Sequence, residues 1–247
     1  MKNVISKLFR WQPSQETLVT VIAGIVMIGL SIALGATESI PWISIIIRDI
    51  GQISLGILFP LLYIRQHGND FISFGFSFKK WYLFLPINLV LGILLLLLFL
   101  SDVPPPDDFR LDTPILGVSA FVMLAVIFEM VFFYGFLRTM FERAFGIVPG
   151  VVLCAVFYSL HHVGFQPEFG KLFVVGLIFA VVYRIGNSVL LLYPFFLGVG
   201  ATYDVLIQSE EVTPVLYPEI RTLYLTVLIL GIIIWLWVKS RPTKNNI

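Results

Sequence analysis

Long apolar runs separated by short polar segments dominate the chain. Residues 17–36 and 81–100 contain no charged residue, and each run is long enough to cross a hydrocarbon layer of about 30 Å as a helix. The apolar residues are continuous and do not alternate with polar ones, as the strands of a membrane barrel would require. The pattern therefore predicts an all-α fold of membrane-spanning helices.

Further apolar runs follow at residues 42–64, 114–137, 147–164, 171–184, 185–207 and 222–238. The segments between them are short, and none has the Pro, Gly and Ser composition of a linker. We therefore expect one transmembrane domain, residues 1–247, built as a bundle of about eight helices. The first run is too long for the apolar core of a signal peptide, and we expect it to be retained as a helix.

Charge patterning predicts the orientation of these helices. If the N-terminus is cytoplasmic, most basic residues lie on the cytoplasmic side, as Lys and Arg in short loops prefer. We therefore expect both termini in the cytoplasm of a prokaryotic cell, with the protein in its plasma membrane. The basic residues on that side are Lys2, Lys7, Arg10, Arg65, Lys79, Lys80, Arg138, Arg143, Arg184, Lys239, Arg241 and Lys244.

Composition supports a membrane protein and excludes other classes. Hydrophobic residues make up 58% of the chain and charged residues 13%, whereas soluble domains carry about 25% charged residues. The net charge of +1 and the absence of a basic stripe argue against a nucleic-acid partner. Cys154 is the only cysteine, so no internal disulfide can form.

Acidic residues inside predicted spans are costly and need a reason. Asp49 adjoins Arg48, and neutralisation by a neighbouring charge gives it a structural role. Glu129 has no basic residue nearby in sequence, Arg138 being the nearest. A carboxyl group in such surroundings suits a general base or acid. The alternative is a protonated side chain that hydrogen-bonds to a neighbouring helix.

Helix geometry predicts a partner for Glu129. If Gly146 is the turn of an antiparallel hairpin, Glu129 and His161 lie about 25 Å and 22 Å from it at about 1.5 Å per residue. The two side chains would then share one depth in the membrane, and a Glu and a His together can activate water. By the same reasoning Thr202 and Asp204, counted from a turn near Gly186, reach a similar depth. Thr202 could donate to an oxyanion and Asp204 could orient a histidine, or either could hold helices together.

A metal is not required by these residues. The chain has no His-Glu-x-x-His motif, and the adjacent His161 and His162 should point about 100° apart on a helix. We therefore expect no metal and no other cofactor.

Several segments resemble the CAAX protease and bacteriocin-processing membrane proteins, which include the type II CAAX prenyl endopeptidases. The resemblance covers residues 74–204. It rests on FGFSFKKW, on FEMVFFYGFLRTMFERAFG, which is similar to the family's Glu-Glu-x-x-x-Arg motif, and on FYSLH, which matches Phe-x-x-x-His. The segment YRIGNSVLLLYPFFLGVGAT resembles the one that carries the family's His-x-x-x-Asn motif.

The motifs match in part. Glu129 stands at the first glutamate, to which the family assigns activation of water, and His161 completes the second motif. Met130 and Tyr134 stand where the family has its second glutamate and its arginine. Gly198 and Thr202 stand at the histidine and asparagine of the third motif, and His162 or Asp204 could compensate for the missing histidine.

The resemblance implies a glutamate-dependent, metal-independent intramembrane endopeptidase with Glu129 and His161 as catalytic residues, assisted by Thr202, His162 or Asp204. The implied partners are a peptide or lipidated-peptide substrate, or a membrane protein, within the lipid bilayer. A member that has lost activity and acts as a scaffold or immunity-type partner is the main alternative. A transporter that uses Glu129 and Asp204 as ion sites is another, but no inverted repeat is apparent.

The orientation can be tested with introduced cysteines. Cysteines at Asp107 and Ser209 should react with an impermeant maleimide added outside the cell, and a cysteine at Lys80 should not, because the charge bias places Lys80 in the cytoplasm. Labelling of Lys80→Cys together with protection of Asp107→Cys would reverse the orientation.

Overall fold

The computed structural model describes residues 2–37, 39–77, 79–102, 104–105, 110, 112–163, 168–186, 188–189, 198–203 and 215–240, and no strand occurs among them. The first half contains α1 (Lys2–Leu8), α2 (Gln15–Ala36), α3 (Pro41–Ile46), η1 (Ile47–Ser54), α4 (Leu55–Gln66), η2 (Phe71–Phe74) and α5 (Trp81–Asp102). The second half contains α6 (Thr113–Ala125), α7 (Ile127–Glu129), η3 (Met130–Leu137), α8 (Arg138–Phe145), α9 (Ile147–Val163), α10 (Phe169–Gly186), α12 (Gly198–Tyr203) and α13 (Pro218–Ser240).

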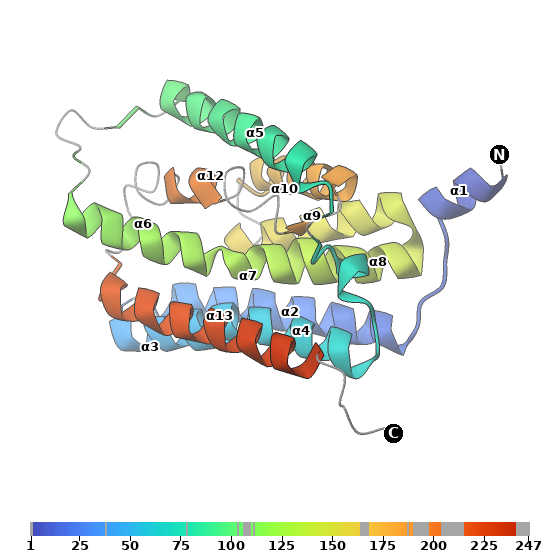
Figure 1. Ribbon diagram of the computed structural model, residues 1–247, viewed down its shortest axis with the longest axis horizontal. Helices are drawn as coiled ribbons and strands as arrows, with labels where there is room; N and C mark the ends of the chain where they lie inside the picture. Colours follow the sequence, from blue (N-terminus) through green and yellow to red (C-terminus); the bar gives the residue numbers. More distant parts are fainter. Residues whose placement is uncertain are drawn as a thin grey trace.

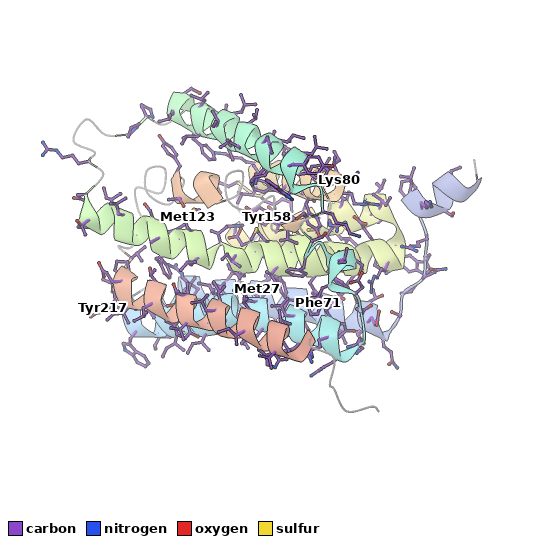
Figure 2. All side chains as sticks on the ribbon, viewed as in Figure 1. Met27, Phe71, Lys80, Met123, Tyr158 and Tyr217 are labelled. Carbon is purple, nitrogen blue, oxygen red and sulfur yellow. The ribbon has the colours of Figure 1, made fainter. Side chains whose placement is uncertain are left out.

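The helices lie in three layers along the long axis of the molecule (Figure 1). One outer layer contains α2, α3, α4 and α13, and the other contains α5, α10 and α12. The nearly continuous helix α6–α7–η3–α8 and its antiparallel neighbour α9 lie between them. Side chains fill the space between the layers, with Tyr217 and Phe71 toward opposite ends of the long axis (Figure 2). The central layer is thus covered by helices on both sides.

The arrangement confirms an all-α polytopic membrane protein. In the described part of the chain six helical segments are long and apolar enough to span a membrane, and Ile147–His162 is a shorter apolar helix. Within the 18-residue apolar window of each span, 44% is buried in the central span Thr113–Phe145 and also in Pro41–Gln66, but 11% in Trp81–Ser101. The span Trp81–Ser101 therefore presents most of its apolar side chains to lipid. The seventh predicted run, residues 185–207, lies largely outside the described residues.

Two segments, η1 and η3, are π-helices. A π-helix closes its hydrogen bonds one residue later than an α-helix, which widens the turn and changes the face on which each side chain lies. Gly135 stands inside η3, where a Cβ atom would come within 3.3 Å of the Met130 carbonyl oxygen and 3.4 Å of the Phe74 carbonyl oxygen. The close approach of backbones there therefore favours glycine.

Asp49 of η1 forms a buried ion pair with Arg221 of α13. The two carboxylate oxygens accept bonds from Nε and Nη2 of Arg221, both at 2.7 Å, and the guanidinium lies 4.0 Å above the Phe121 ring. The sequence suggested Arg48 as the partner because it is adjacent, whereas the bidentate partner comes from the far end of the chain. The ion pair joins η1 to α13 within the outer layer, and the contact with Phe121 joins Arg221 to α6. These contacts support the structural role expected for Asp49.

This ion pair gives a stability prediction. Asp49→Leu should lower the free energy of unfolding by about 3–5 kcal/mol, because it leaves the Arg221 guanidinium buried without its counter-charge. The double variant Asp49→Leu/Arg221→Met should recover most of the loss, since it removes both charges. Thermal unfolding of the purified proteins in detergent measures both effects. Equal losses in the single and double variants would show that the charges do not depend on each other.

Candidate active site

The α8–α9 hairpin brings together residues that are far apart in sequence. Its turn is at Gly146, whose φ of +92° is a conformation that other residues rarely adopt, and a Cβ atom there would lie 2.6 Å from the Leu8 carbonyl oxygen. Glu129 ends α7, and His161 and His162 lie in the last turn of α9. Because α9 packs antiparallel to α8, the last turn of α9 reaches the level of Glu129, as the hairpin geometry predicted.

Glu129, His161 and His162 form a compact polar cluster in this central layer. One carboxylate oxygen of Glu129 and one ring nitrogen of each histidine all lie within 4.8 Å of one another. Nε2 of His162 is 3.7 Å from Oε1 of Glu129. Glu129 and His161 are buried, whereas the His162 side chain is 31% exposed. The cluster is therefore covered on the Glu129 side and accessible beside His162.

Aromatic side chains surround the cluster. The His161 ring lies 5.4 Å from the Phe128 ring and 5.1 Å from the Phe133 ring, measured between centroids. The His162 ring lies 4.5 Å from the ring of Tyr158. Such walls exclude bulk water and strengthen electrostatic interactions inside the site.

Hydrogen bonds from α2 and η1 hold the His161 ring. Ser31 Oγ of α2 is 2.6 Å from Nδ1 of His161, and Nε2 of Gln52 donates to Ser31 Oγ at 2.9 Å. Gln52 is buried in η1. Neither residue was predicted from the sequence, since a serine and a glutamine in apolar helices stand out far less than a charge. Their positions inside the first two predicted spans were the only available signal.

The structure does not bring Thr202 into this cluster among its described contacts. The Thr202 hydroxyl donates to the carbonyl oxygen of Gly198 in its own helix at 2.7 Å, and α12 packs against α5 and α6. Asp204 lies outside the described residues, as does most of the segment that resembles the family's third motif. The roles of Thr202 and Asp204 therefore stay predictions.

The positions of the family's second glutamate and arginine are buried in the packed interior. Met130 and Tyr134 are buried in η3, and the Tyr134 ring packs against the rings of Tyr158 and Phe179 at 5.7 Å and 5.8 Å. Arg138, one turn later, is directed into a structural network. Its Nε donates to the Tyr134 carbonyl oxygen at 3.1 Å, its Nη1 pairs with Glu142, and its guanidinium lies 4.2 Å above the Tyr183 ring.

The spacing of the cluster limits what it can bind. Contrary to the expected divergence of His161 and His162, both rings offer a nitrogen to the same space as Glu129. A tetrahedral Zn²⁺ with ligands at about 2.1 Å needs donor atoms about 3.4 Å apart. A water molecule bound at about 2.8 Å has partners about 4.6 Å apart. The printed separation of 3.7 Å between Nε2 of His162 and Oε1 of Glu129 lies between these two values. The cluster could therefore hold one bridging water or, after a small contraction, a metal ion.

The segment that carries the cluster also matches a known family. Residues 111–197 match the family model described as "Type II CAAX prenyl endopeptidase Rce1-like". The resemblance predicted from the sequence is confirmed. Glu129, His161 and His162 all lie inside the matched segment, and so do Met130 and Tyr134. No curated protein and no solved structure gives a significant match to the chain. The similarity to the type II CAAX prenyl endopeptidases thus covers residues 111–197, which include the central hairpin and the cluster.

Proposed function

We propose that the protein is a CAAX-type intramembrane endopeptidase in which Glu129 activates water without a metal ion. The observation that carries this proposal is the cluster of buried Glu129 with His161 and His162, which lies on the hairpin of a membrane bundle inside the segment that matches a protease family. A buried acid in a membrane helix is a candidate functional residue, and Glu129, unlike Asp49, lies beside two histidines instead of an arginine. This arrangement suits proton transfer.

The cluster is suited to hydrolysis by a general base. A water between Glu129 and the histidines gives a proton to the Glu129 carboxylate while its oxygen attacks the carbonyl carbon of a peptide bond. The tetrahedral intermediate then collapses, the C–N bond breaks, and the protonated Glu129 returns its proton to the leaving nitrogen. His161 orients the attacking water. His162 lies at the exposed side of the cluster, where a substrate carbonyl would enter.

The substrate follows from the location of the site. A site within the central layer takes a peptide that reaches into the membrane, such as a lipidated peptide or the end of a membrane segment. The protein acts in the plasma membrane of a prokaryote, with both termini in the cytoplasm. Thr202 and Asp204 remain secondary candidates for oxyanion stabilisation and histidine orientation.

A second candidate is an inactive family member that acts as a scaffold or immunity-type partner. It is favoured by Met130 and Tyr134, which replace two polar motif residues and are buried among apolar side chains. In that case Glu129 is a structural residue, and its buried carboxyl is retained for a hydrogen bond.

Cleavage assays on the purified protein separate the two candidates. Prenylated and unmodified peptides that end in a CAAX sequence, carrying a quenched fluorophore, serve as probes. Glu129→Gln should lower cleavage by about 100–10,000-fold, because an amide cannot accept the proton of water. The variant should unfold at an equal or higher temperature than the wild type, since a residue held for catalysis is seldom optimal for stability.

Matched controls make the result specific. Glu219→Gln changes an exposed glutamate, and His67→Gln changes the histidine outside the cluster, which stacks on Tyr63; neither should alter cleavage. Cleavage should also persist after treatment with a chelator. A Glu129→Gln protein that cleaves at the wild-type rate contradicts the mechanism, and a wild type that cleaves no probe while Glu129→Leu loses about 1–3 kcal/mol of stability supports the structural role.

A further inference from the structure

The contacts of Ser31 allow the proton on the His161 ring to be assigned. Ser31 Oγ has three neighbours within hydrogen-bond distance: Nδ1 of His161 at 2.6 Å, Nε2 of Gln52 at 2.9 Å and the Met27 carbonyl oxygen at 3.2 Å. A hydroxyl group can donate once and accept twice. The three neighbours therefore fill its capacity, provided that exactly one of them is an acceptor.

Two of these neighbours have fixed roles. The amide Nε2 of Gln52 can only donate, and the Met27 carbonyl oxygen can only accept. Ser31 donates to Met27, four residues earlier in α2, in the backbone contact that serines commonly make within helices. The only hydrogen of the Ser31 hydroxyl is then engaged, so the remaining contact requires a hydrogen on Nδ1 of His161.

The assignment does not depend on which way the Gln52 amide group is turned. Exchanging the amide oxygen and nitrogen of Gln52 leaves the result unchanged, because Ser31 would then donate to Gln52 and still have to accept from Nδ1. Each of these arrangements leaves Nε2 of His161 without a proton.

We infer that Ser31 and Gln52 are positioning residues that hold His161 as the Nδ1–H tautomer, with the lone pair of Nε2 available to a water beside Glu129. The role of this tautomer in catalysis rests on the proposed function. An unprotonated Nε2 accepts one hydrogen of the water while Glu129 removes the other. His161 therefore orients the nucleophile, and an oxyanion must find its donor elsewhere.

The fold explains why these two residues reach His161. Ser31 lies on the face of α2 that packs against α9. Gln52 lies in the π-helix η1, which packs against both α2 and α7. The hydrogen-bonded chain thus crosses three elements, and each end is buried. A buried polar group that loses its hydrogen-bond partner destabilises the fold. Each residue of this hydrogen-bonded series therefore fixes the position of the next.

Nitrogen-15 NMR of the histidine-labelled full-length protein in detergent micelles tests the assignment directly. The His161 signals are identified by their loss in His161→Gln. In the wild type we expect a protonated Nδ1 and an unprotonated Nε2. Ser31→Ala should raise the protonated fraction of Nε2 to at least half, because it removes the acceptor that selects Nδ1–H. Gln52→Leu should shift the fraction in the same direction, and Ser31→Thr should restore the wild-type spectrum.

The matched control is Ser119→Ala. Ser119 also donates to the carbonyl four residues earlier in its helix, at 2.7 Å. Its replacement by alanine removes the same kind of backbone contact from a helix that does not hydrogen-bond to His161 through Ser119. It should leave the spectrum unchanged. A wild-type His161 protonated at Nε2 overturns the inference, and so does a Ser31→Ala spectrum identical to the wild type in a protein that unfolds at the wild-type temperature.

Kinetics then separate this inference from the proposed function. If the wild type cleaves the peptide probes, Ser31→Ala should lower kcat by about 10–100-fold, as is typical of residues that orient a functional histidine, with KM unchanged. Cleavage by a protein with the opposite tautomer refutes the inference alone. The expected tautomer in a protein that cleaves no probe leaves the inference standing and refutes the proposed function.

Discussion

The antiparallel packing of α8 and α9 about Gly146 is the constraint on which the site depends. His161 and His162 are adjacent in sequence, but Glu129 lies far from both along the chain. The continuous helix from Glu129 to Phe145 and helix α9 are joined by a turn that allows only a glycine conformation, and they place the side chains of Glu129 and His161 at one depth. The surrounding layers then shield the cluster from lipid, so a polar centre exists inside an otherwise apolar bundle. A shift of the hairpin by one turn would separate the two residues by about 5.4 Å.

Polar groups inside the bundle are held by partners from distant segments. Asp49 is bound by Arg221, and Gln52 reaches His161 through Ser31. Arg138 is instead satisfied within its own continuous helix, by Tyr134, Thr139 and Glu142. In an apolar environment an unpaired polar group is costly, and these pairings fix how the layers meet. Both π-helices contribute to them. The wider turns of η1 place Asp49 and Gln52 toward different neighbours, and η3 follows directly after Glu129.

Much of this arrangement could be predicted from the sequence. Uninterrupted apolar runs revealed the spans, because a membrane helix must satisfy its own backbone and cover itself with apolar side chains. Residue counting from Gly146 placed Glu129 beside His161. The sequence could not reveal the partners Arg221, Ser31 and Gln52, because the rotation of each helix and the packing of the layers determine which side chains meet. A π-helix also changes the face on which a side chain lies. For the same reason the convergence of His162 with His161 was not predicted. Counting residues gave a depth for Thr202 but did not show which helices α12 packs against.

A high-resolution experimental structure of the wild type in a lipid nanodisc tests the central claim most directly. The account predicts an ordered water within about 3.2 Å of a Glu129 carboxylate oxygen and of His161 Nε2, with His162 at the exposed side of the same space. An apolar side chain packed between Glu129 and His161, or a metal ion bound to all three residues, would contradict it.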